Sequence, residues 1–193
     1  MKFSLPCVIF AGGRSSRMGE DKSLLPFGNF KTLTQYQLHR LNQIFQNVYI
    51  STKESSKFDF EADFIEDVKT DISAPTVGFV SIFEKLECES FFALSVDTPF
   101  VDYEIIATIL DSDTNILDAT IATVDGKVQP LCGVYHNSLY DSFKKMLQQD
   151  THKLGFLLKS KNVKLIEFDC KDKFLNMNHK SEYEKGLAIL ERC

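Results

Sequence analysis

Residues 8–22 read Val8-Ile9-Phe10-Ala11-Gly12-Gly13-Arg14-Ser15-Ser16-Arg17-Met18-Gly19-Glu20-Asp21-Lys22. A short apolar run stops at two glycines, which predicts a buried strand that passes into a loop. Glycine has no Cβ atom and adopts positive φ at little cost, so the amide groups of Gly12 and Gly13 can approach an anion closely. Arg14, Arg17 and Lys22 bring positive charge to a chain whose formal net charge is −5. This stretch therefore predicts a site for the phosphates of a nucleotide.

The glycine spacing differs from that of the two commoner phosphate loops, G-x-x-x-x-G-K-[ST] and G-x-G-x-x-G. A P-loop GTPase and a dinucleotide-dependent dehydrogenase are therefore disfavoured. The simplest alternative is an ordinary glycine turn with charged residues on the surface. Residues 12–31 nevertheless show no clear helical periodicity. Connections much longer than about 4–6 residues in compact domains tend to be functional or disordered, so we favour a functional loop.

The whole chain has the composition of an ordinary globular protein. Its 193 residues, 44% hydrophobic and 25% charged, fit one domain, which we expect to span residues 1–193. A pI near 5.4 argues against a nucleic-acid-binding surface. No apolar run approaches the ~18–20 residues of a membrane span, and the run before Gly12 is too short for a signal peptide. The five cysteines are widely spaced without a C-x-x-C pair, which predicts reduced thiols and a cytoplasmic protein.

Strand and helix patterns alternate along the chain. Strands are predicted at residues 5–10, 47–51, 62–66, 91–96, 118–124, 130–135 and 163–168. Of the helices between and after them, one is predicted to begin at a capping box of Thr32 and Gln35, and the last at a capping box of Ser181 and Glu184. This alternation predicts an α/β fold with a doubly wound, mainly parallel, Rossmann-like sheet and helices on both faces. Ligands of such folds bind outside the carboxyl ends of the strands.

The carboxylate of Asp97 stands at the end of the buried fourth strand and is followed by Thr98-Pro99-Phe100. A carboxylate there costs desolvation unless a cation or hydrogen-bond donor pairs with it. Mg²⁺ suits this position, because it typically binds one or two protein carboxylates and completes its coordination with water and substrate phosphates. The alternative is a helix N-cap, a role open to both Asp97 and Asp102.

Residues 10–22 resemble the loop L-A-[GA]-G-x-[ST]-x-R-M-G-x-D-K of a nucleotidyltransferase family, and most closely that of the MobA-like molybdenum cofactor guanylyltransferases. The pair Gly12-Gly13 carries the distinction, because relatives that transfer a cytidylyl group more often have Ala-Gly. Phe10 stands where Leu is usual. The resemblance extends to about residue 184 and implies the fold of the nucleotide-diphospho-sugar transferases. It also implies that Asp97 is the magnesium ligand, which leaves Asp102 as the cap.

The resemblance implies two further sets of residues. Contacts with GTP are implied for Phe10, Ala11, Gly12, Gly13, Lys22, Ser51, Asp67 and Asp97. Contacts with the acceptor are implied for Gly78, Gln129, Pro130, Asn176 and Asn178.

Several of these positions have plainer interpretations or depart from the family pattern. Asp67 could be a solvated turn carboxylate, residues 129–135 a plain core strand, and Asn176 and Asn178 turn formers. Ser51 stands where Asn is frequent, the glycine that usually precedes Pro75 is absent, and His179-Lys180 replaces Thr-Pro. If residues 176–178 are extended, the two Asn side chains point the same way.

The activity implied is transfer of GMP from Mg-GTP to the terminal phosphate of molybdopterin, with release of pyrophosphate. Arg17, Lys22 and Asp97 would be the catalytic residues, acting by alignment and charge neutralisation, because an anionic acceptor phosphate needs no general base. Lys22 and Asp97 must then face one cleft.

The expected partners are GTP, molybdopterin in its free or molybdenum-bound form, and, transiently, cofactor-biosynthesis proteins or molybdoenzyme chaperones. We expect a monomer that binds neither nucleic acid nor membrane. One alternative is a nucleotidyltransferase of the same fold that uses CTP or a sugar phosphate. A nucleotide-binding regulator without catalysis is the other.

Overall fold

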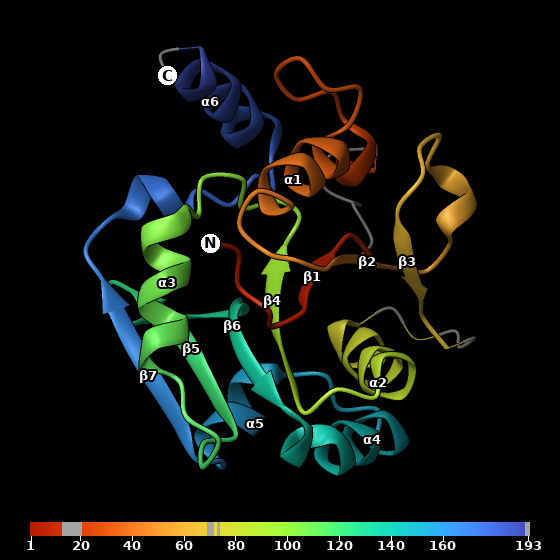
Figure 1. Ribbon diagram of the computed structural model, residues 1–193, viewed down its shortest axis with the longest axis vertical. Coiled ribbons are helices and arrows are strands. Elements are labelled where there is room, and N and C mark those ends of the chain that lie inside the picture. The colour runs from red at the N-terminus through yellow and green to blue at the C-terminus, as the bar shows by residue number, and fades with distance from the viewer. Residues whose placement is uncertain (13–20, 69–71, 73, 192–193) are drawn as a thin grey trace.

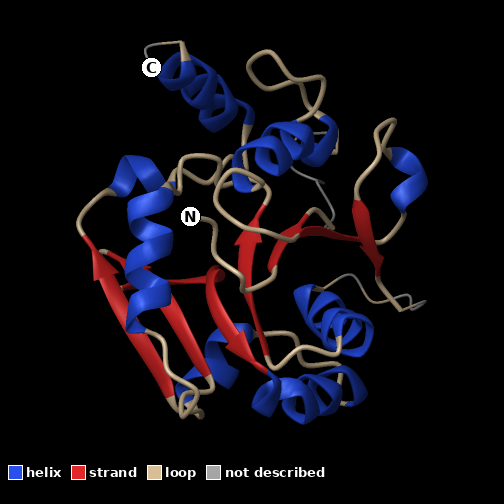
Figure 2. Ribbon diagram, in the orientation of Figure 1, coloured by secondary structure: helices blue, strands red, loops and turns tan. Residues whose placement is uncertain are grey.

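The structure is a computed structural model that describes residues 1–12, 21–68, 72 and 74–191. Its centre is one seven-stranded sheet with helices on both sides (Figures 1 and 2). The strands are β1 (Cys7–Phe10), β2 (Val48–Thr52), β3 (Asp63–Glu66), β4 (Ser90–Ser95), β5 (Ala119–Val124), β6 (Lys127–His136) and β7 (Val163–Phe168). All seven strands expected from the sequence are present, and β6 begins three residues earlier than predicted.

The sheet has the order β3-β2-β1-β4-β6-β5-β7. Neighbouring strands from β3 to β4 are parallel, as are β5 and β7, whereas β6 is antiparallel to both of its neighbours. The chain leaves β1 toward β2 and β3 and then returns to place β4 on the other side of β1. The carboxyl ends of β1 and β4 therefore form the topological switch point, where ligands of this architecture bind. The predicted doubly wound, mainly parallel sheet is confirmed.

The antiparallel strand β6 follows β5 through a tight turn. Asp125 and Gly126 both have positive φ, 50° and 67°, and Val124 pairs with Lys127. A two-residue Asp-Gly loop of this kind matches the twist of a β-hairpin. The hairpin inserts β6 between β4 and β5 and brings residues 129–131 toward the carboxyl end of β4, where Leu94 pairs with Cys132.

Helices cover the two faces of the sheet in separate groups. The helices are α1 (Leu33–Leu41), α2 (Pro75–Leu86), α3 (Tyr103–Ser112), α4 (Tyr140–Gln148), α5 (Leu154–Lys159) and α6 (Lys180–Leu190). Side chains of α1 and α3 pack in one core cluster, and those of α2, α4 and α5 pack in another. Short 3₁₀ turns include η1 (Lys22–Leu24) and η2 (Ser55–Lys57). No helix in the described ranges is both long and apolar enough to cross a bilayer.

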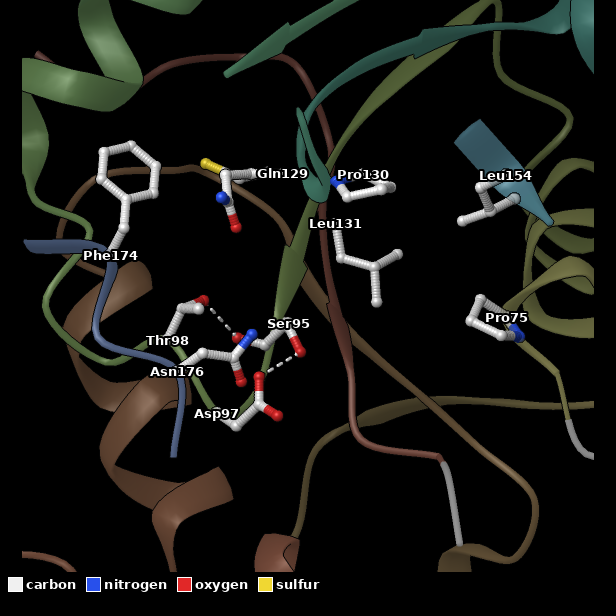
Figure 3. Close-up of a pocket in the computed structure, with 11 residues that line it drawn as sticks. Pro75, Ser95, Asp97, Thr98, Gln129, Pro130, Leu131, Leu154, Phe174 and Asn176 are labelled. Carbon is white, nitrogen blue, oxygen red and sulfur yellow. Dashed lines mark hydrogen bonds between the residues drawn. The ribbon is translucent and has the colours of Figure 1, made fainter. Parts of the chain in front are cut away.

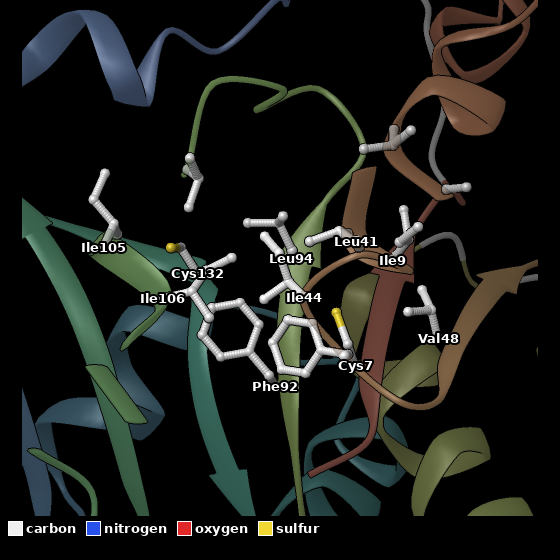
Figure 4. Packing of buried hydrophobic residues seen from close by; sticks show 14 of the residues in the cluster. Cys7, Ile9, Leu41, Ile44, Val48, Phe92, Leu94, Ile105, Ile106 and Cys132 are labelled. Carbon is white, nitrogen blue, oxygen red and sulfur yellow. The ribbon is translucent and has the colours of Figure 1, made fainter. Parts of the chain in front are cut away.

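Alternation along β1 and β4 explains why both strands are continuously apolar. In β4, Phe92 and Leu94 join the α1/α3 cluster, whereas Phe91 and Ala93 join the α2/α4/α5 cluster. Figure 4 shows the first cluster. Both faces are buried, so neither set of positions can be polar.

Two helix N-termini agree with the sequence and one does not. Thr32 caps α1 by accepting a hydrogen bond from the Gln35 amide (3.0 Å), and Asp102 caps α3 through the Ile105 amide (3.1 Å). The predicted capping box of Ser181 and Glu184 is wrong, because α6 begins at Lys180.

The carboxylate of Glu182 decides where α6 begins. It accepts the amide hydrogens of Asn178 and His179, each at 2.8 Å. The bond to the N-cap residue His179 is that of a capping box, and the bond to Asn178 ties the first turn of α6 to the Asn176–Asn178 segment.

Four cysteines of the described chain, Cys7, Cys88, Cys132 and Cys170, are free thiols, as predicted. Burial raises the pKa of Cys132 to about 12 and that of Cys7 further still. A thiol that stays protonated is a poor nucleophile, so these two act as packing residues.

We predict that Gly133→Ala destabilises the fold. A Cβ atom at Gly133 would lie 2.3 Å from the carbonyl oxygen of Thr120 on β5, which is backbone and cannot rotate away. The expected loss is about 1–3 kcal/mol in the free energy of unfolding, measured by urea denaturation. Gly155→Ala in α5 is the matched control, because a Cβ there has no neighbour within 4 Å. Equal stability of the two variants would contradict this account of the β5/β6 contact.

Candidate active site

Lys22 and Asp97 form an ion pair at the switch point. Asp97 directly follows β4 and is 6% exposed, and Lys22 is the first residue of η1. The Lys22 Nζ lies 2.5 Å from Asp97 Oδ2 and donates to Asn178 Oδ1 at 2.7 Å. Asp97 and Asn178, which lie 75 and 156 residues after Lys22 in the sequence, thus meet at its ammonium group. The prediction that Lys22 and Asp97 face one cleft is confirmed.

The Asp97 carboxylate has further partners on both oxygens. The Ser95 hydroxyl donates to Asp97 Oδ1 at 2.6 Å (Figure 3). The amide group of Asn176 lies against the same carboxylate, and with its nitrogen turned toward Asp97 it donates to the two oxygens at 2.9 and 3.1 Å. The Met177 amide donates to the main-chain oxygen of Asp97 at 3.0 Å. The segment before α6 is therefore docked on Asp97 through both side chain and backbone.

A buried polar pair on α1 holds the turn that carries Asp97. Gln37 Nε2 donates to the carbonyl oxygens of Ser95 (3.3 Å) and Val96 (3.2 Å). Arg40 donates to Gln37 Oε1 through Nε (3.2 Å) and Nη2 (2.6 Å), and its Nη1 donates to the carbonyl oxygen of Val101 (2.5 Å). Both ends of the β4–α3 turn are thus tied to one helix. The sequence analysis did not identify this pair, although Gln37 lies four residues from both Leu33 and Leu41 on the buried face of α1.

Three hollows lie in a row along the carboxyl edge of the sheet. The β2 hollow, about 90 Å³, is lined by Phe10, Gly12, Ser51, Lys53, Asp67, Ala74, Pro75 and Gly78. The central hollow, also about 90 Å³, is lined by Phe10, Ala11, Gly12, Asp21, Lys22, Ser23, Ser95, Val96, Asp97 and Leu131. The β6 hollow, about 270 Å³, is lined by Pro75, Ser95, Asp97, Thr98, Gln129, Pro130, Leu131, Cys132, Leu154, Phe174 and Asn176. Neighbouring hollows share lining residues and therefore adjoin one another, and the three together are called the cleft below.

In the β2 hollow a half-buried carboxylate faces a narrow space. Burial raises the pKa of Asp67, opposed by the charge of Lys53 and a long hydrogen bond from Ser51 Oγ (3.5 Å). Gly78 forms part of the wall, because a Cβ there would lie 2.9 Å from Ser51 Oγ and 3.0 Å from the ring of Phe10. Gly78 therefore lies with the residues assigned to GTP and not beside Gln129.

The β6 hollow combines an apolar wall with polar groups at its edge. Pro130, Leu131, Leu154 and Phe174 supply the wall, and Gln129 and Asn176 supply amides (Figure 3). Asn178 lies next to this hollow, and its Nδ2 is 2.8 Å from the amide of Asn176. Such a space suits a ligand that has an apolar surface and polar groups at its edge.

The structure brings most of the residues singled out from the sequence into this cleft. The β2 and central hollows are lined by Phe10, Ala11, Gly12, Lys22, Ser51, Asp67 and Asp97, and the β6 hollow by Gln129, Pro130 and Asn176. Gly13 and Arg17 lie outside the described residues. Ser95, Thr98 and Lys53 also line the cleft, although the sequence assigned no contact to them.

Gly12, a lysine and a buried carboxylate share a cleft at the switch point of a doubly wound sheet, an arrangement typical of the nucleotide-binding α/β transferases. A sequence model described as the MobA-like NTP transferase domain matches residues 7–164. The chain belongs to this family.

Similar proteins cover almost the whole chain. A relative from Campylobacter jejuni subsp. doylei, named molybdenum cofactor guanylyltransferase, is 40% identical over 188 residues, 97% of each chain. One of the same name from Helicobacter pylori (strain G27) is 30% identical over 193 residues, 97% of this chain and 94% of the relative. The crystal structure of molybdopterin-guanine dinucleotide biosynthesis protein A from Archaeoglobus fulgidus matches with a TM-score of 0.83 at 20% identity, over 98% of this chain and 100% of that one. That structure shows the same fold.

We predict that Gln37→Leu loosens the Asp97 turn. The substitution removes two hydrogen bonds to main-chain carbonyls and leaves Arg40 without its side-chain acceptor. Unsatisfied buried groups cost about 1–3 kcal/mol each, so chemical denaturation should show a clear loss of stability. Gln43→Leu is the control, because Gln43 is exposed and the one hydrogen bond described for its side chain is to His39. A loss no larger than that of the control would show that α1 does not support this turn.

Proposed function

We propose that this protein is a molybdenum cofactor guanylyltransferase, which transfers GMP from GTP to the terminal phosphate of molybdopterin and releases pyrophosphate. The observation that carries the proposal is the Lys22–Asp97 pair, which lies between a hollow suited to a nucleoside and a hollow suited to a planar acceptor. The names of the two bacterial relatives support the same assignment.

The nucleotide would extend from the β2 hollow into the central hollow. Asp67 can accept hydrogen bonds from N–H or O–H groups of the guanosine part, and its partial burial strengthens such bonds. Gly12 and the amides beside it would bind the phosphates, with Lys22 and Arg17 compensating their charge. GTP would thus run from β2 toward β4 across the end of β1.

Asp97 has the chemistry of a magnesium ligand. Among the described carboxylates that line the cleft it is the most buried, and both of its oxygens face polar partners and not apolar side chains. No cluster of three or more His, Cys, Asp or Glu side chains within the described ranges could hold a metal without substrate. Such a site fits Mg²⁺, which commonly takes one carboxylate and uses phosphates and water for the rest. When bound, Mg²⁺ would neutralise charge on the donor phosphates.

The acceptor would lie in the β6 hollow with its phosphate toward Asp97. Its ring system would pack on Pro130, Leu131 and Phe174, with Gln129 and Asn176 as hydrogen-bond partners. The attacking phosphate oxygen already carries negative charge, so the protein needs to supply no base. Its contribution is to align the two phosphates and to offset the charge that builds up between them, chiefly through Lys22.

We predict that Lys22→Ala or Asp97→Ala reduces turnover by at least about 100-fold, the scale seen when one preorganised electrostatic group is removed. Pyrophosphate release from GTP and molybdopterin measures turnover, and circular dichroism checks that each variant is folded. Lys31→Ala, which removes an exposed ion pair with Asp59, should retain the parent rate. If Lys22→Ala or Asp97→Ala turns over at the parent rate, the substituted residue does not have the proposed catalytic role.

We predict that GTP with Mg²⁺ raises the melting temperature of the protein and that CTP does not, because only a ligand bound by the folded state stabilises it. Differential scanning fluorimetry measures the shift. A larger shift with CTP would favour the cytidylyl-transferring alternative. Binding of GTP without pyrophosphate release in the presence of molybdopterin would favour a regulator.

A further inference from the structure

Lys57 contacts residues on both sides of segment 12–20, which is called the glycine loop below. It is the last residue of η2, and its Nζ lies 3.2 Å from the carbonyl oxygen of Ala11, 2.8 Å from Asp21 Oδ2 and 3.0 Å from Ser23 Oγ. Ala11 stands directly before Gly12, and Asp21 stands directly before Lys22. One side chain thus bridges the points where the loop begins and ends.

The contacts of Lys57 use up its hydrogen-bonding capacity. An ammonium group has three N–H donors, and the three acceptors around Lys57 match that number. Its side chain is 21% exposed, and Nζ also lies 4.9 Å from the centre of the Phe58 ring. Lys57 therefore has no donor left for a phosphate unless one of these bonds breaks, and its role differs from that of Lys22.

Asp21 connects Lys57 to Lys22. Its carboxylate caps η1 by accepting hydrogen bonds from the Ser23 amide (3.0 Å) and hydroxyl (2.7 Å). Burial alone would raise the pKa of Asp21, but the hydrogen bonds from Lys57 and Ser23 outweigh it and hold the pKa below its ordinary value of 3.8. Asp21 is therefore an anion under ordinary conditions, and it lines the central hollow.

We propose that Lys57 is a positioning residue for the nucleotide: it clasps Ala11 to Asp21 and Ser23, sets the direction of Lys22 through η1, and neutralises the Asp21 carboxylate beside the triphosphate. This inference rests on the proposed function, because it assigns the central hollow to the phosphates of GTP. Without Lys57, the Asp21 carboxylate would face those phosphates uncompensated, and like charges at short range repel.

The test compares Lys57→Met, Asp21→Asn, the double variant and Lys31→Met in the full chain. Lys31 is a matched control because it pairs with Asp59 across neighbouring segments, at 3.2 Å, with both side chains mostly exposed. The dissociation constant of GTP in the presence of Mg²⁺ is measured by calorimetry, together with KM, kcat and the melting temperature.

We expect Lys57→Met to weaken GTP binding about tenfold, because the uncompensated Asp21 carboxylate then repels the phosphates and Lys22 is no longer held toward them, while the melting temperature stays within about 5 °C of the parent. Asp21→Asn should weaken binding less, because it removes the repelling charge along with the clasp. The double variant should bind no more weakly than Lys57→Met alone, and Lys31→Met should match the parent.

Parent affinity in Lys57→Met, or a loss in the double variant equal to the product of the two single losses, would overturn the proposal. Should Lys57→Met fail to fold, Lys57→Arg keeps the charge but presents a planar fork to three convergent acceptors, and we expect a loss of a few-fold in affinity. Parent affinity in Lys57→Arg would then overturn the clasp. If the parent protein binds no GTP, the proposed function itself fails, whereas GTP binding by the parent and by Lys57→Met alike rejects the clasp alone.

Discussion

A carboxylate buried at the end of β4 is the constraint that organises the functional half of this molecule. Removing a charge from water costs several kcal/mol unless partners replace the water. Besides Ser95 on its own strand, Asp97 has partners from two distant parts of the chain: Lys22 after β1, and Asn176 in the segment before α6. The need to pair one anion therefore draws the N-terminal loop and the C-terminal segment to the same end of the sheet.

Most of the strands could be predicted because they contain short runs of apolar residues at the length of a strand, and burial on both faces of β1 and β4 leaves little ambiguity. The direction of β6 was not predicted, because periodicity carries no information on strand direction. The signal was local, in Asp125-Gly126, whose positive φ angles close a hairpin. The start of α6 was missed for a different reason. Ser181 and Glu184 have capping-box spacing, but Glu182 satisfies the amides of Asn178 and His179, which tertiary docking on Asp97 holds in place.

The polar residues of the site that follow strand ends could be predicted from the sequence. The residues that hold them in place could not. The rule that ligands bind beyond the carboxyl ends of parallel strands is enough to place Lys22 and Asp97 at one site. The roles of Gln37, Arg40 and Lys57 could not be predicted, because several of their main partners are backbone carbonyls far away in sequence. Every residue has a backbone carbonyl, so the sequence does not indicate which one a side chain will contact. Gly78 shows a related limit. The family pattern put it among the acceptor contacts, but the fold places it against Phe10 and Ser51.

The antiparallel strand β6 and the parallel strands β1 and β2 contribute residues to different parts of the cleft. The parallel strands β1 and β2 deliver residues to it from their carboxyl ends, and each is tied to a crossover helix whose packing fixes its register. Strand β6 delivers Gln129, Pro130 and Leu131 from its amino-terminal half, a short distance from a tight turn. A hairpin can change in length or side chains without moving a crossover. If the β6 hollow takes the proposed acceptor, its wall can therefore vary while the strands at the proposed nucleotide site keep their register.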